Sequence, residues 1–251
     1  ITSLVTLALF LLSKYVDPSE ISWLTLAQFS GIAGLFYLCW AFLLSIRHRK
    51  IENLFSGLDK VYKIHHLLGG IAYLFIINHP LFLILNRFPQ NTLKLYLLPS
   101  DTPSYSFGVL AFYLLNLLLI LTIFINLPYK IWKWTHEWIG LVVLLSGLHS
   151  LLIISDISRY APLRYWMFFW ILTALISYLY KRFFYYLLQK PNNYQIVDSE
   201  TEKGILYLTV KPKTSSQKIL FYPGQFAFLS LTPSRDEHPF TILSQKEDDV
   251  I

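Results

Sequence analysis

The feature that most constrains this chain is a series of long apolar segments. Each approaches the roughly 20 residues that an α-helix needs to cross a hydrocarbon core about 30 Å thick. Hydrophobic residues make up 55% of the 251 residues and charged residues only 14%, whereas soluble domains carry roughly a quarter charged residues. We therefore predict a mainly α-helical membrane protein with six helices, at residues 1–16, 21–46, 64–86, 107–127, 132–154 and 165–188.

Basic residues are distributed unevenly between the loops that connect these segments. Lys and Arg concentrate on the cytoplasmic side of membrane proteins. The loops after the second and fourth segments and the stretch after the sixth together carry twice as many Lys and Arg residues as the opposite side. We therefore expect an integral protein of the cytoplasmic membrane, with both ends of the chain in the cytoplasm. The net charge of +6 is attributed to this topology rather than to nucleic-acid binding.

Five of the seven histidines fall within or at the ends of the apolar segments, where an ionisable residue is a functional candidate. His65 and His79 are fourteen positions apart, which places their side chains within about 40° of each other and about 21 Å apart along a helix. His136 and His149 are thirteen positions apart, and an ideal helix would leave them about 140° apart. The second pair therefore requires local overwinding, a kink or different ring placements.

The expected topology brings the two pairs to matching depths in the membrane. Both histidine-bearing segments begin on the cytoplasmic side, so His65 and His136 share an inner level, and His79 and His149 share an outer level. Two imidazoles from two helices are the axial ligands of a six-coordinate haem, which suits electron transfer. Zinc would usually take four ligands, or three and a water. We therefore predict two b-type haems.

His66 is an alternative inner ligand, because its spacing to His79 is also thirteen residues. His65 is favoured, since HHLLG from His65 and HEWIG from His136 both place a glycine four positions after a histidine. His66 would then point about 100° away, as a packing residue or as a contact to a haem propionate.

Glycines near the inner histidines indicate where a flat macrocycle could lie. Gly69 and Gly70 follow His65 by about one turn, and Gly140 follows the other inner histidine in the same way. They would remove side-chain bulk beside a porphyrin, although glycine also permits close packing of membrane helices. Histidines that bond to a neighbouring helix, or that relay protons in a transporter, are further alternatives. Segment 64–86 contains no acidic residue that would support a proton relay.

The stretch after the sixth segment changes to the patterning of β-strands. Residues 194–198 and 204–211 alternate or are rich in strand-forming residues, and the sequence PGQ opens a further strand at 224–231. This predicts an antiparallel sheet or barrel. Together with the paired histidines, YPGQFAFLSL at 222–231 and HPFT at 238–241 make the chain resemble the ferric reductase and NADPH oxidase family.

The resemblance implies a division of the chain into two parts. Residues 1–190 would form a six-helix haem-binding transmembrane domain, and residues 191–251 the start of a cytosolic FAD-binding β-barrel. A complete flavin barrel of this family is longer, and the sequence has no glycine-rich dinucleotide fingerprint. We therefore expect a fragment in which the site for NAD(P)H lies outside the chain.

The resemblance also implies roles for the HPFT segment. His238 and Pro239 would help to shape the flavin site, Phe240 would pack near it, and Thr241 would reach the edge of the isoalloxazine ring. Phe240 as an ordinary core residue and Thr241 as an ordinary strand hydroxyl are the alternatives that the residues themselves leave open.

The implied activity is that of an NAD(P)H-dependent oxidoreductase embedded in the lipid bilayer. A flavin would pass single electrons to the inner haem and then to the outer haem, and the acceptor would be oxygen or a ferric chelate. Leu83 stands one turn past His79, where animal-type oxidases of the family carry a further histidine, so the sequence leaves this choice open. The alternative is a haem-bearing subunit that exchanges electrons between quinol or a flavin and a partner protein. The sequence does not specify an oligomeric state.

Overall fold

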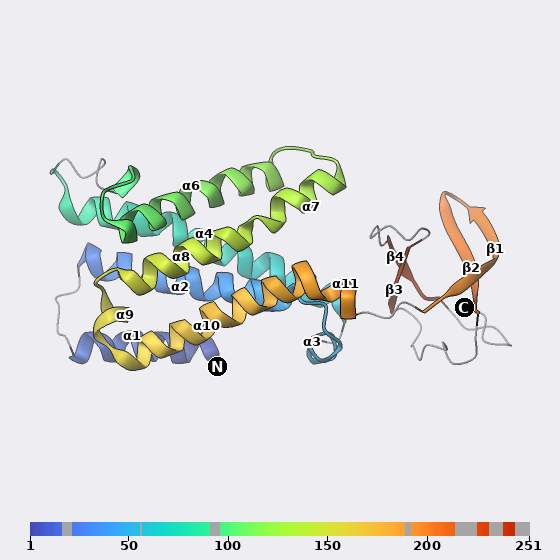
Figure 1. Cartoon of the computed structure of the whole chain (residues 1–251), viewed down its shortest axis with the longest axis horizontal. Coiled ribbons are helices and arrows are strands. Elements are labelled where there is room, and N and C mark those ends of the chain that lie inside the picture. The colour runs from blue at the N-terminus through green and yellow to red at the C-terminus, as the bar shows by residue number, and fades with distance from the viewer. Residues whose placement is uncertain are drawn as a thin grey trace.

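The structure, a computed structural model, describes residues 1–16, 22–55, 57–90, 96–188, 192–213, 225–230 and 238–243. A bundle of long helices forms one part of the molecule, and small sheets lie beyond one end of it (Figure 1). The helices of the bundle are α1 (Thr2–Val16), α2 (Trp23–Leu44), α4 (Leu58–Arg87), α6 (Pro103–Ile123), α7 (Tyr129–Glu137), α8 (Ile139–Leu152) and α10 (Ala161–Leu179). Shorter elements are α3 (Arg49–Leu54), α9 (Asp156–Arg159), a π-helical turn (Tyr180–Phe184) and α11 (Tyr185–Leu188).

Five of the described helical segments are long and apolar enough to cross a membrane. They cover α2, α4, α6, α7 with α8, and α10 with the π-helical turn. Helix α1 is also apolar but has only 15 residues, fewer than the roughly 20 that a span requires. The expected count of six spans is therefore not confirmed, whereas the other five predicted segments each correspond to an observed one.

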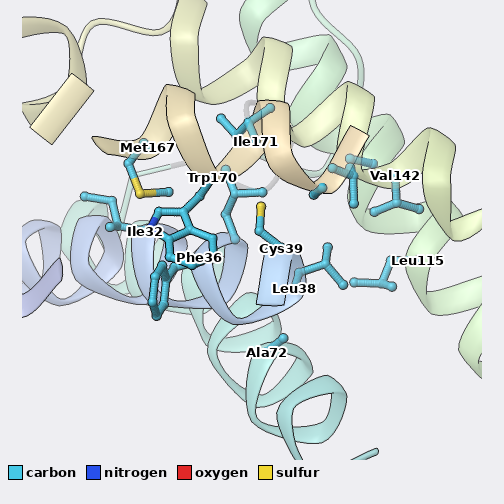
Figure 2. Packing of buried hydrophobic residues seen from close by; sticks show 14 of the residues in the cluster. Ile32, Phe36, Leu38, Cys39, Ala72, Leu115, Val142, Met167, Trp170 and Ile171 are labelled. Carbon is cyan, nitrogen blue, oxygen red and sulfur yellow. The ribbon is translucent and has the colours of Figure 1, made fainter. Parts of the chain in front are cut away.

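The core of the bundle lies between α2 and the helices around it. Phe36 of α2 packs edge-on against Trp170 of α10, with ring centres 5.3 Å apart, and Cys39 and Met167 are fully buried beside them (Figure 2). Many large apolar side chains of the other helix faces are exposed, as Leu117 on α6 shows. Exposed apolar surface of this extent is typical of a protein that contacts another apolar phase, here the lipid bilayer.

A buried ion pair attaches α1 to the rest of the bundle. Lys14 at the end of α1 lies 2.9 Å from Asp156 of α9 and donates a 2.6 Å hydrogen bond to the side-chain carbonyl of Gln28 on α2. The side chain of Asp156 is only 2% exposed. A neutral hydrogen bond from Trp166 to Thr6 (2.9 Å) adds a second attachment between α1 and α10.

The described strands form two separate antiparallel pairs. β1 (Tyr194–Glu202) and β2 (Ile205–Pro212) are joined by a tight turn at Lys203 and Gly204, both of which have positive φ as such hairpins require. β3 (Phe226–Leu229) pairs with β4 (His238–Thr241). No closed barrel is formed by the strands that the structure describes, so the expected barrel is not confirmed. Residues 224 and 231 of the predicted strand at 224–231 lie outside the described residues.

Candidate functional site

The four predicted histidine ligands lie in two pairs. The rings of His65 on α4 and His136 on α7 have centres 6.2 Å apart, with a 67° angle between their planes. The rings of His79 on α4 and His149 on α8 are also 6.2 Å apart, with an angle of 71°. The structure thus places the histidines at two levels along the bundle, in the pairing that the sequence predicts. Whether they bind a metal stays a prediction.

A break between α7 and α8 explains how histidines thirteen residues apart can both face α4. The amide of Trp138 donates to the carbonyl of Thr135 (3.1 Å), and that of Leu141 donates to the carbonyl of Trp138 (2.9 Å). Hydrogen bonds between residues three apart are those of a 3₁₀-helix, which has three residues per turn instead of 3.6. The chain is therefore overwound between His136 and His149, which is one of the solutions that the sequence left open.

Three of the four rings are held by backbone carbonyl groups of a neighbouring helix. Because a carbonyl oxygen can only accept, Nδ1 of each ring must carry the proton, and Nε2 keeps its lone pair. A hydrogen bond on one ring nitrogen is what orients a metal-binding imidazole and raises its basicity. These bonds join His65 to Ala41 (2.9 Å), His79 to Ala27 (2.7 Å) and His149 to Ser104 (2.7 Å).

His136 is held differently from the other three. Its Nδ1 is buried and has no hydrogen-bond partner among the described residues. Its ring instead stacks on Trp132, one helical turn earlier, with centres 5.4 Å apart and planes 13° apart. Sequence analysis missed this role of Trp132, although an aromatic residue four positions before a histidine on a helix is a detectable signal.

The spacing of both pairs fits two imidazoles on opposite sides of one metal ion. Metal–imidazole bonds of about 2 Å, with ring centres about 1.1 Å beyond the nitrogen atoms, would separate the ring centres by about 6.2 Å. In the described part of the chain, no group of three or more His, Cys, Asp and Glu side chains could hold a metal ion. The donor set therefore fits a metal whose remaining ligands come from a macrocycle, and it does not fit a protein-bound zinc ion.

The glycines predicted to make room for a macrocycle have two different environments. A Cβ atom added to Gly69 or Gly70 would meet nothing within 4 Å, so both face open space as expected. A Cβ atom added to Gly140 would instead collide with the ring of Tyr178. The prediction for Gly140 is therefore wrong, because α8 and α10 approach each other closely there and the glycine serves helix packing.

His66 does not take part in the inner pair. Its ring lies 5.8 Å from that of His65 and is exposed, whereas His65 lies opposite His136. The placement agrees with the preference for His65 over His66.

The HPFT segment forms the whole of β4. His238, Pro239 and Thr241 are exposed, and Phe240 is partly buried. The structure therefore brings the four predicted flavin residues together on one short strand. Pro239 lies opposite Phe228 of β3.

Arg47, which sequence analysis missed, connects this sheet to the helical bundle. Its guanidinium lies 4.2 Å from the ring centre of Phe228, and its Nε donates a 2.6 Å hydrogen bond to Tyr62 of α4. Burial lowers the pKa of Arg47, but interactions with Tyr62 and Tyr185 outweigh it and hold the pKa above its ordinary value. Arg47 also has a φ of 54°, which is uncommon for residues other than glycine. The basic sequence RHRK at 47–50 is the only signal that could have drawn attention to it.

Comparison with known proteins gives one family. Residues 30–147 match the family described as ferric reductase like transmembrane component. This segment contains His65, His79 and His136, and His149 lies two residues beyond it. No curated protein matches the chain.

Proposed function

We propose, from the match of residues 30–147 to the ferric reductase-like transmembrane family, that this membrane protein is an oxidoreductase that carries electrons across the bilayer through two haems. His65 and His136 would hold the inner haem, and His79 and His149 the outer one. The observation that carries the proposal is the 6.2 Å separation of the ring centres in both pairs. Bound haem supplies reversible one-electron transfer.

The contribution of the polypeptide is to hold imidazoles at two depths. His79 lies fourteen positions after His65 on α4, which corresponds to about 21 Å along the helix. The carbonyl groups of Ala27 and Ala41 fix two of these rings through Nδ1. Ala72, which lies between the two histidines on α4, belongs to the buried apolar core of the bundle.

The HPFT strand supports a flavin donor at the inner end. We propose that residues 191–251 contribute to an FAD site with His238, Pro239, Phe240 and Thr241, and that NAD(P)H reduces the flavin. The small sheets lie beyond the end of the bundle that carries α3 and α11 (Figure 1). The contact of Arg47 with Phe228 joins β3 to that end.

The proposed orientation follows the basic loops. The loops after α2 and α6 and the segment after α10 would face the cytoplasm, and the level of His79 and His149 would face the opposite side. An acceptor there, oxygen or a ferric chelate, would receive the electrons. Superoxide detection and ferric-chelate reduction assays on the purified protein distinguish the two acceptors.

An absorption spectrum tests the proposal directly. The purified protein should show the sharp reduced-minus-oxidised bands of low-spin haem, with two haems per chain. His79→Ala should remove about half of the haem, because it deprives one level of an axial ligand. His66→Ala is the matched control and should leave both haems in place. A wild-type protein without low-spin haem bands, or equal losses in the two variants, would contradict the assignment.

A further inference from the structure

We propose that Gly31 and Gly108 are positioning residues for the two outer histidines. Each forms, with the carbonyl group of the residue four positions earlier, a recess that fixes one imidazole ring. We call Ala27 with Gly31 on α2, and Ser104 with Gly108 on α6, the two outer seats. The expected effect of these seats on haem binding rests on the proposed function. The hydrogen bonds and close contacts that define the seats are present in the polypeptide itself.

The first seat holds the ring of His79 against α2. A Cβ atom added to Gly31 would lie 2.9 Å from Nδ1 and 3.1 Å from Cε1 of His79. Nδ1 of the same ring donates its 2.7 Å hydrogen bond to the carbonyl of Ala27. The ring therefore lies directly over the glycine and bonds to the turn before it.

The second seat repeats this arrangement on a different helix. A Cβ atom added to Gly108 would lie 2.7 Å from Nδ1 and 2.9 Å from Cε1 of His149. Nδ1 of His149 donates a 2.7 Å hydrogen bond to the carbonyl of Ser104. In both seats the glycine follows a small acceptor residue by four positions, in AQFSG at 27–31 of α2 and in SYSFG at 104–108 of α6.

Helix geometry explains why the fourth residue must be glycine. Residues four positions apart lie one above the other on a helix face. The Cα–Cβ bond points toward the N-terminus of the helix, so a side chain on residue i+4 covers the carbonyl of residue i. That carbonyl already accepts the helical bond from residue i+4 and has a second lone pair available. Inside a helix, a glycine at position i+4 lets an imidazole ring lie directly over this lone pair.

Neither histidine of the inner pair lies over a glycine of this kind. His65 bonds to the carbonyl of Ala41, and the residue four positions on is Ser45, which lies beyond the last residue of α2. His136 stacks on Trp132 and has no Nδ1 partner among the described residues. Both outer imidazoles thus donate to a carbonyl, but only one inner imidazole does. Since such bonds raise ligand basicity, breaking an outer bond should raise the midpoint potential of the outer haem.

Single substitutions to alanine in the full chain test the seats, with Gly147→Ala as the matched control. A Cβ atom at Gly147 would lie 2.9 Å from Ile171, so this variant introduces comparable crowding two residues from His149 without touching a histidine ring. We expect Gly31→Ala and Gly108→Ala each to lose about half of the bound haem, or to keep it with a raised outer potential and an altered low-spin EPR signal. Gly147→Ala should keep both haems with wild-type potentials.

Three outcomes of this experiment would overturn the proposal. In the first, both seat variants keep the haem content, the potential and the EPR signal of the wild-type protein. In the second, Gly147→Ala loses as much haem as Gly31→Ala and Gly108→Ala do. In the third, a seat variant loses the inner haem alone. Retention of the inner haem in a seat variant shows that the bundle has folded.

A measurement on the unsubstituted chain keeps the proposal testable if the variants fail to fold. In haem-free protein labelled with ¹⁵N-histidine, His79 and His149 should be protonated on Nδ1 and not on Nε2, because a carbonyl can only accept. The opposite tautomer at both residues would refute the seats. A wild-type chain that binds no haem but shows the expected tautomers would refute the proposed function and leave the seats intact.

Discussion

Replacing Lys14 by methionine should destabilise the bundle strongly, because it leaves a carboxylate buried without its counter-ion. Lys14 and Asp156 are 2.9 Å apart, with side-chain exposures of 16% and 2%. The other carboxylate oxygen, Oδ2, is buried and has no hydrogen-bond partner among the described residues, so Lys14 provides the principal compensation for this charge. Removing one partner of a buried ion pair costs about 3–5 kcal/mol. We expect Lys14→Met to lower the free energy of unfolding by that amount.

A double-mutant cycle in detergent micelles or bicelles separates the ion pair from simple packing. Asp156→Leu should cost less than Lys14→Met, since Lys14 still has Gln28 at 2.6 Å and is partly exposed. The double variant Lys14→Met with Asp156→Leu should recover most of the loss, because a well-packed apolar pair replaces a buried ionic one at little cost. Thr6→Val is the control: it removes the neutral bond to Trp166 and should cost about 1 kcal/mol. A loss below about 1 kcal/mol for Lys14→Met, or additive losses in the double variant, would refute this account.

Three other substitutions probe the glycines and the sheet contact. Gly69→Leu should leave the stability of the haem-free bundle within about 0.5 kcal/mol, since a Cβ atom there meets nothing within 4 Å, but it should lower the inner haem content in absorption spectra. Gly140→Ala should lower the unfolding free energy by about 1–3 kcal/mol by overpacking against Tyr178, as measured by thermal unfolding. Arg47→Gln should slow electron transfer from photoreduced flavin to haem in flavin-loaded protein, because it removes the charge above Phe228, while direct reduction of the haem by dithionite stays unchanged.

The membrane segments could be predicted from the sequence because hydropathy is a local property. The predicted segment 21–46 corresponds to Trp23–Leu44, and 165–188 overlaps Ala161–Phe184. The pairing of histidines could also be predicted, since it follows from spacing on α4 and from the parallel direction of two helices. The break at Trp138 could be stated only as one of several solutions, because the local winding of a helix depends on what its side chains meet.

Features that depend on contacts between distant residues could not be predicted. Gly69 and Gly140 follow a histidine in the same local pattern, yet one faces open space and the other faces Tyr178 of a helix later in the chain. The bond from His79 to Ala27 spans 52 positions, and nothing in the apolar run around Gly31 distinguishes it from a packing glycine. The strands were expected from their alternation, but the way in which sheets close is not encoded in any single strand.

The two outer seats have a consequence for how such a membrane protein is assembled. The seat on α2 receives a histidine from α4, and the seat on α6 receives one from α8, so each ring is oriented within a pair of neighbouring helices that pack closely together. The ring of His79 can therefore be oriented within one half of the bundle, α2 with α4, before that half packs against the other. The ring of His149 can likewise be oriented within the other half, α6 with α8. A group bound by one histidine from each half then stabilises the assembled bundle through mass action, because it binds only when the two halves are packed together. On this view, binding of that group would add to the packing of α10 against α2 and α8, which already joins the two halves.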